Sequence, residues 1–169
     1  MIIKSVRGFK PMYGDDCFFA ENSVLIGDVI MGNNCSIWYS AVVRGDVNSI
    51  KIGDRVNIQD GVVIHGTYLK AKTEIGNDVS IGHNAIVHGC TINDRVLVGM
   101  GSIIMDDSII GSNSIIAAGS LLLKNTKVTE GSVYAGVPAK KIKDVSPELQ
   151  RGEIERIARN YIKYASWFK

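Results

Sequence analysis

Aliphatic residues stand at every sixth position through the second half of the chain. The uninterrupted series is Val98, Ile104, Ile110, Ile116, Leu122 and Val128. A small hydroxyl residue follows each member four positions later, from Ser102 to Ser132. A period of six fits neither the 3.6-residue period of a helix nor the simple alternation of a long strand. It predicts a short strand and a turn, repeated, with the aliphatic side chain inside and the small residue at a tight corner.

The same frame continues upstream with two breaks. Its upstream members are Ile52, Ile58 and Ile64, then Ile75, Ile81 and Val87. The step from Ile64 to Ile75 is nearly twice the regular step and crosses mostly polar sequence, which predicts a small protruding loop. A second step of the same length separates Val87 from Val98, near Cys90. The repeats span about residues 20–135, which corresponds to roughly six coils of three repeats each.

A helix is predicted after the repeats, over about residues 146–167. Ser146 is a hydroxyl N-cap, and Pro147 occupies the first helical position. Apolar residues from Leu149 to Ala165 then follow at helical spacing, so one face should pack along the outside of the coils. We therefore predict a mainly β chain that forms a single domain over residues 1–169, with a parallel β-helix of repeats and one C-terminal helix.

Composition and charge exclude several classes of protein. The net charge is +2 without a clustered basic face, so nucleic-acid binding is not predicted. No run of 18 apolar residues exists and the start lacks a long apolar stretch, which argues against a membrane span and against secretion. The three cysteines are far apart with no CxxC pair, which indicates reduced thiols and a cytoplasmic protein.

The only three histidines, His65, His83 and His88, fall in one short stretch of the chain. Imidazole is the commonest ligand of zinc-type metals, and three imidazoles with a water form an open catalytic site. The alternative is three ordinary surface histidines. His65 and His88 each follow an inward aliphatic residue and should point outward. His83 follows His65 by the length of one three-repeat coil, so we expect the three near one vertical edge, in a site formed by one chain or completed by a neighbouring subunit.

Several short motifs carry a resemblance to a known family. They are Arg44-Gly45-Asp46, Asn57-Ile58-Gln59-Asp60-Gly61, His65, Gly82-His83-Asn84 and Val87-His88-Gly89. In order and spacing they resemble the γ-class carbonic anhydrases, and the repeat resembles the hexapeptide-repeat proteins to which that class belongs. The resemblance implies a left-handed parallel β-helix of triangular section. It covers nearly the whole chain.

The resemblance also implies a function and an assembly. His65 and His88 of one subunit and His83 of its neighbour would hold Zn²⁺, with Fe²⁺ or Co²⁺ as alternatives, at three sites of a homotrimer. A metal-bound hydroxide would convert carbon dioxide reversibly to bicarbonate. The implied roles of the other residues are these: Gln59 contacts the solvent ligand or bicarbonate, Arg44 and Asp46 pair across the interface, Asp60 supports Arg44 or the metal site, and Tyr161 lies near the metal.

Each of these residues also has a simpler interpretation. Arg44 and Asp46 could form a plain surface ion pair, Gln59 could be a turn residue, and Tyr161 could belong to the core. Two other functions also stay open. One is a coenzyme A-dependent acyltransferase, for which the repeat and the turn at residues 136–140 are typical. The other is a metal-stabilised trimeric scaffold without turnover.

The chain departs from the best-characterised pattern of the class at the proton shuttle. Val47 stands where that pattern has a glutamate, and the loop at residues 66–74 is short and basic, with Lys70 and Lys72. The missing acidic residues predict slow proton release rather than loss of the reaction.

Overall fold

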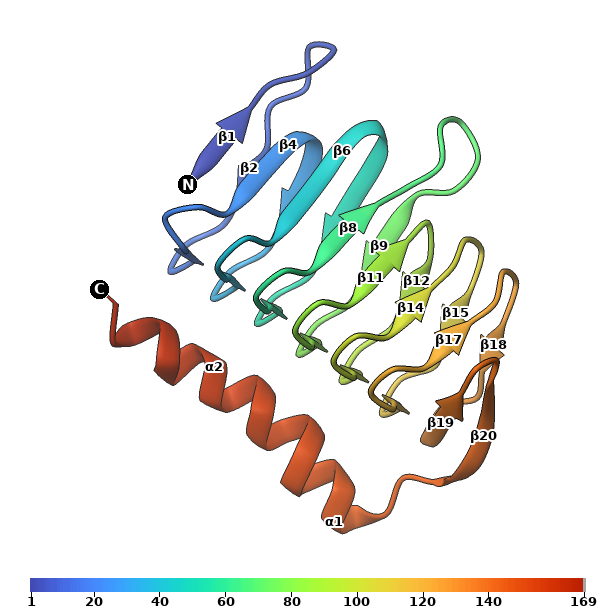
Figure 1. The fold of residues 1–169 in the computed structure, drawn as a ribbon. Helices are drawn as coiled ribbons and strands as arrows, with labels where there is room; N and C mark the ends of the chain where they lie inside the picture. The colour runs from blue at the N-terminus through green and yellow to red at the C-terminus, as the bar shows by residue number, and fades with distance from the viewer. Residues whose placement is uncertain (169) are drawn as a thin grey trace.

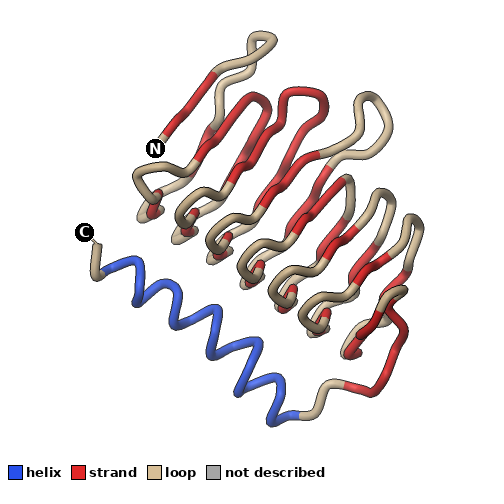
Figure 2. The backbone as a smooth tube through the Cα atoms, viewed as in Figure 1, coloured by secondary structure: helices blue, strands red, loops and turns tan. Residues whose placement is uncertain are grey.

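The structure, a computed structural model, describes residues 1–168 and consists of a parallel β-solenoid with one C-terminal helix. The coils stack along one axis for about seven turns, one more than the repeats predict, because β1, β2 and β3 pair with the solenoid ahead of residue 20. Strands occupy the flat sides of each coil and turns occupy its corners (Figure 2). The predicted fold, a left-handed β-helix with a C-terminal helix, is confirmed.

The strands form three walls, which we number in chain order. Wall 1 contains β1 (Ile2–Lys4), β8 (Val63–His65), β11 (Ile86–His88), β14 (Ile103–Ile104) and β17 (Leu121–Leu122). Wall 2 contains β2 (Met12–Tyr13), β9 (Thr73–Ile75), β12 (Thr91–Ile92), β15 (Ile109–Ile110) and β18 (Lys127–Val128). The long strands β4 (Val24–Met31) and β6 (Val42–Ile52) run through both walls (Figure 1). Wall 3 contains β3 (Phe18–Phe19), β5 (Ser36–Ile37), β7 (Asn57–Ile58), β10 (Ser80–Ile81), β13 (Leu97–Val98), β16 (Ile115–Ile116) and β19 (Ser132–Gly136), followed by the antiparallel β20 (Ala139–Asp144).

The predicted inward residues form continuous columns inside the solenoid. In wall 1 the column contains Ile64, Val87, Ile104 and Leu122, all fully buried and paired in register. Each aliphatic side chain therefore packs on its counterpart in the next coil, at the parallel-strand spacing of about 4.8 Å. The core is built from these columns rather than from a contact between separate layers.

The two breaks in the repeat have different structural causes. The loop at residues 66–72 protrudes as predicted, and its base is closed by a bridge between Thr67 and Ala71. It makes one coil longer than three repeats, so that Ile58 pairs with Ile81. The second break contains no loop. Ile92 is buried in the column of wall 2, so the steps around it are five and six residues, and the coil is shortened by one.

The C-terminal helix runs along wall 3 back toward the N-terminal coils (Figure 1). It contains α1 (Pro147–Leu149), a π-helical turn η1 (Gln150–Glu155) and α2 (Arg156–Ser166). As predicted, the Ser146 hydroxyl caps it by accepting the N–H of Leu149 at 3.3 Å. Ile154 and Ala165 are its buried anchors against the wall. Within residues 1–168, no helix is both long enough and apolar enough to cross a membrane.

The columns predict a sharp difference between two adjacent isoleucines. Ile110 is fully buried, whereas Ile109 on the same strand points outward. Ile110→Ala should lower the free energy of unfolding by about 2–5 kcal/mol, because it leaves a cavity between coils. Ile109→Ala, the matched control, should change it by much less. Urea denaturation followed by circular dichroism would measure both, and equal losses would contradict the inward column.

Candidate metal centre

Two histidines lie side by side at the corner between walls 1 and 2. His65 ends β8 and His88 ends β11, and the two residues are register partners on neighbouring coils. Each follows a buried aliphatic residue, so its side chain points outward as predicted. Nδ1 of His65 lies 3.3 Å from Nε2 of His88.

The other nitrogen of each ring contacts a carboxylate. Nε2 of His65 lies 2.9 Å from Oδ1 of Asp46, and Nδ1 of His88 lies 2.5 Å from Oδ1 of Asp106. Burial alone raises the pKa of Asp46, but hydrogen bonds from His65 and Arg44 outweigh it and lower the pKa below its usual value. Asp106 behaves in the same way, with Thr67 and His88 as donors. Both groups are therefore ionised at neutral pH and accept the ring N–H.

This arrangement fits a metal ion. When each ring N–H is directed to its carboxylate, the two facing nitrogens each present a lone pair. Two lone pairs at 3.3 Å repel one another unless a cation lies between them. Two nitrogens bound at about 2.0–2.1 Å to a tetrahedral ion lie about 3.3–3.4 Å apart. A carboxylate behind a ligating imidazole also fixes its tautomer and orientation.

Two further side chains hold the carboxylates. Nη1 of Arg44 pairs with Oδ2 of Asp46 at 2.5 Å, and Thr67 Oγ1 donates to Oδ2 of Asp106 at 2.5 Å. Gly45 separates Arg44 from Asp46 because a Cβ there would overlap the carbonyl oxygen of Asp28. Thus Arg44 and Asp46 pair within one chain, at the histidine site.

Asp106 and Thr67 were missed by sequence reasoning. The coil between β11 and β14 is one residue shorter than a regular coil, so Asp106 lies one position beyond the residue that faces His88, and the repeat indicated only its corner. Thr67 belongs to the inserted loop, where no periodic signal exists.

His83 lies at a different corner, between walls 3 and 1, in the turn after β10. Its Nδ1 lies 2.9 Å from Oδ2 of Asp60. All three histidines therefore share one feature: a carboxylate contacts one ring nitrogen and leaves the other available to a ligand. Asp60 supports His83 rather than Arg44.

The three histidines do not converge within one chain. Among residues 1–168, no group of three histidine, cysteine or carboxylate side chains could hold a metal ion. This corrects the expectation that all three gather near one vertical edge. The inserted loop lengthens the coil after His65, so its partner one coil on is His88 and not His83.

Gln59 and Tyr161 lie beside His83, on a cavity of about 340 Å³ between α2 and wall 3. Oε1 of Gln59 accepts the backbone N–H of His83 at 3.2 Å, and its Nε2 donates to Asn57 at 3.0 Å. The Tyr161 ring packs edge-on against Trp38. Burial, and then the charge of Asp60, raise the pKa of Tyr161 to about 12, so its phenol keeps its proton at neutral pH.

Two family models match the repeat region. The model for "Bacterial transferase hexapeptide (six repeats)" matches residues 89–124, and that for "Hexapeptide repeat of succinyl-transferase" matches residues 72–105. A protein of Methanocaldococcus jannaschii named "Probable carbonic anhydrase" is 47% identical, over 97% of this chain and 93% of its own length. The chain belongs to the γ-carbonic anhydrase-like family of hexapeptide-repeat proteins.

Other proteins similar to the chain carry different names. Protein YrdA of Escherichia coli is 43% identical to the chain, over 96% of this chain and 91% of its own length. The crystal structure of a hexapeptide transferase family protein from Anaplasma phagocytophilum matches with a TM-score of 0.93 and 39% identity, over 99% of this chain and 98% of that one. Membership of the γ-carbonic anhydrase-like family therefore agrees with the predicted resemblance, while the names of the relatives include both lyases and transferases.

The carboxylate behind His88 gives a testable expectation. Asp106→Asn should weaken metal binding by about 10- to 100-fold, because the amide no longer fixes the imidazole tautomer. Asp107→Asn is the matched control, since Asp107 is exposed and pairs with Lys124 at 3.2 Å. Zinc retained after dialysis against graded chelator measures both. Equal retention by wild type and Asp106→Asn would refute the metal-supporting role of Asp106.

Proposed function

We propose that this protein is a cytoplasmic homotrimer that hydrates carbon dioxide reversibly to bicarbonate, at metal sites between its subunits. In each site His65 and His88 of one subunit and His83 of its neighbour hold Zn²⁺, or alternatively Fe²⁺ or Co²⁺. The observation that carries the proposal is the pair of facing ring nitrogens 3.3 Å apart, each ring backed by a carboxylate. Relatives named carbonic anhydrase support the same reaction.

The donor set supports the reaction class. A zinc-type ion held by three neutral imidazoles lowers the pKa of a bound water to about 7 and so supplies a nucleophile at neutral pH. The chain contributes Asp46, Asp60 and Asp106, which keep the three imidazoles oriented. Gln59 has its amide held by Asn57 and by the backbone of His83, and an amide nitrogen has a second N–H that can donate to a bicarbonate oxygen.

The outer face of wall 1 supports a homo-oligomer. Its outward residues form an aliphatic column across five coils: Val42, Val63, Ile86, Ile103 and Leu121. Wall 3 is covered by the chain's own helix, and the corresponding column of wall 2 contains Lys51, Glu74 and Lys127. An aliphatic column of this kind along one outer wall is typical of a surface that is covered in the assembled protein.

The position of the histidines supports a closed ring of subunits. His65 and His88 lie at one edge of wall 1, and His83 lies at the other. A contact that joins one edge to the opposite edge of the next copy is head-to-tail, and such contacts close into cyclic oligomers. Each such contact would bring His65 and His88 of one copy beside His83 of the next copy. The ring would then hold one three-histidine site for each subunit.

An acyltransferase is the second candidate function. His83 with Asp60 behind it has the arrangement of a general base, and it lies on the cavity beside α2. A structural relative named as a transferase agrees with this alternative. The acyltransferase alternative gives no role to the facing nitrogens of His65 and His88. Chelator that abolishes carbon dioxide hydration in stopped flow, and zinc that restores it, would support the lyase; metal-independent acyl transfer would support the transferase. Metal binding without either activity would leave the metal-stabilised trimeric scaffold as the remaining candidate function.

Mixed assembly tests the shared site directly. His83→Ala and His88→Ala should each lose metal and activity alone, because three ligands leave no redundancy. In co-expressed mixed trimers, a chain with intact His65 and His88 can sit beside a chain with intact His83. Random mixing should then restore about one quarter of the sites.

Metal content and hydration rate of the co-purified mixture measure this result. The expected particle mass by light scattering is three times 18.4 kDa. Mixed trimers without any restored site would contradict ligands shared between subunits, and a metal-loaded monomer would contradict the assembly.

The departure at Val47 predicts a dependence on buffer. Val47 follows Asp46 in β6 and is partly exposed at the histidine corner. Asp46, Asp60 and Asp106 are engaged with the histidines, and no glutamate stands at position 47 to accept the proton. The proton should then leave through an external buffer, so the hydration rate should rise with the concentration of an imidazole-type buffer. Val47→Glu should reduce that dependence by supplying an acceptor. Stopped-flow hydration at fixed ionic strength measures it, and a rate flat in buffer for both proteins would rule out the missing-shuttle account.

A further inference from the structure

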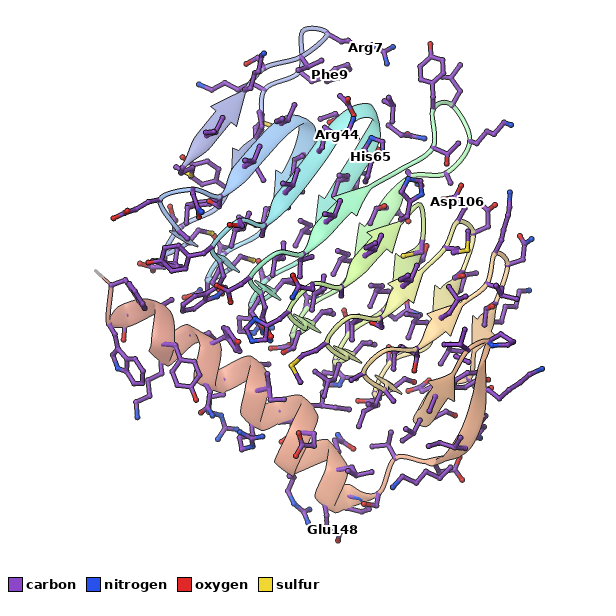
Figure 3. All side chains as sticks on the ribbon, viewed as in Figure 1. Arg7, Phe9, Arg44, His65, Asp106 and Glu148 are labelled. Carbon is purple, nitrogen blue, oxygen red and sulfur yellow. The ribbon has the colours of Figure 1, made fainter. Side chains whose placement is uncertain are left out.

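Two segments far apart in sequence protrude beside the histidine pair. One is the N-terminal hairpin, closed by a bridge between Val6 and Phe9, with Arg7 at its tip. The other is the inserted loop at residues 66–72, with Tyr68 exposed on it. In Figure 3, Arg7, Arg44, His65 and Asp106 follow one edge of the solenoid, on the side away from the helix.

Arg7 connects the two segments. Its guanidinium carbon lies 5.4 Å from the centroid of the Tyr68 ring, which is a cation–π contact. Its Nη1 also donates to the backbone carbonyl of Asp46 at 3.3 Å. A single exposed side chain thus joins the loop after His65 to the residue that orients His65.

These contacts complete a ring of neighbouring residues that passes through the proposed metal position. Beginning and ending at the same residue, the ring runs through Arg7, Asp46, His65, His88, Asp106, Thr67, Tyr68 and Arg7. Its links are hydrogen bonds, the covalent step from Thr67 to Tyr68, the cation–π contact, and the facing nitrogens of His65 and His88, which a bound ion would join. The gap between the His65 and His88 nitrogens is where the ion would lie.

We infer that Arg7 and Tyr68 are positioning residues whose contact closes this ring, holds the two histidines at ligand separation and slows the loss of a bound ion. The physical reason is preorganisation. Asp46 and Asp106 reach the histidines from β6 and from the turn after β14, and the hairpin and the loop are closed at their bases by the Val6–Phe9 and Thr67–Ala71 bridges. Linking the two tips restricts how far the two carboxylates, and so the two rings, can separate. The inference rests on the proposed metal site.

The test is the rate at which zinc passes from the loaded trimer to a colorimetric chelator in excess. Tyr68→Leu removes the ring without a change of charge and should raise the rate about two- to fivefold. Tyr68→Phe keeps an aromatic face and should release zinc at the wild-type rate. Arg7→Gln removes both the contact with Tyr68 and the hydrogen bond to Asp46, so it should raise the rate at least as much as Tyr68→Leu, and the double variant should be no faster than Arg7→Gln alone.

Matched measurements separate positioning from a general loss of stability. Trp167→Leu removes a comparable contact, Lys163 over Trp167 at 6.0 Å, at the helix end, and should leave the rate unchanged. The urea midpoint of the metal-free protein should be the same for Tyr68→Leu and wild type. Zinc loss from Tyr68→Leu at the wild-type rate, with one zinc per wild-type chain, would overturn the inference and leave the proposed function intact. A wild-type protein that binds no zinc, iron(II) or cobalt(II) would overturn both.

Discussion

The stacking of one coil on the next in parallel register is the constraint on which the rest of the structure depends. Each inward aliphatic side chain packs on its counterpart at about 4.8 Å, so a shift of one residue in any coil would turn buried side chains outward. Insertions are consequently confined to corners. The extra residues after His65 form a loop at such a corner, and Ile75 returns to its column beyond them. The same insertion brings His88, rather than His83, into register with His65.

The repeat frame explains why the fold could be predicted from the sequence almost completely. The six-residue series from Val98 to Val128 predicts the repeating coil directly, and Ser146-Pro147 predicts where the helix starts. What could not be predicted was the length of each coil around the histidines. Ile92 was not recognised as a column member because its step is five rather than six, and the spacing between His65 and His83 matched a regular coil by coincidence. Local deviations from the period therefore decided the geometry of the site.

The candidate site divides in the same way between what periodicity can and cannot supply. The outward direction of His65 and His88 follows from their buried neighbours, Ile64 and Val87. The carboxylates behind the rings come from other coils. Asp46 was singled out by resemblance, whereas Asp106 lies one position beyond the residue that faces His88 across a shortened coil. Gln59 and Asp60 were singled out by resemblance, and the structure places both in contact with His83, whereas Tyr161 reaches the same cavity from a helix whose docking no repeat specifies.

The location of the histidines on one wall has a consequence for the whole protein. A β-helix wall is flat and only a few residues wide, so its two edges cannot approach each other within one chain. In the proposed trimer, the two histidines at one edge and the one at the other would be two halves of a shared site, and the aliphatic column between them would form the contact surface. A single operation, the docking of one copy's edge on the next copy's opposite edge, would complete the ligand set and cover the column together. In this arrangement apolar burial supplies the association energy, and the carboxylate-backed imidazoles, which gain little until a cation joins them, supply the specificity of the contact.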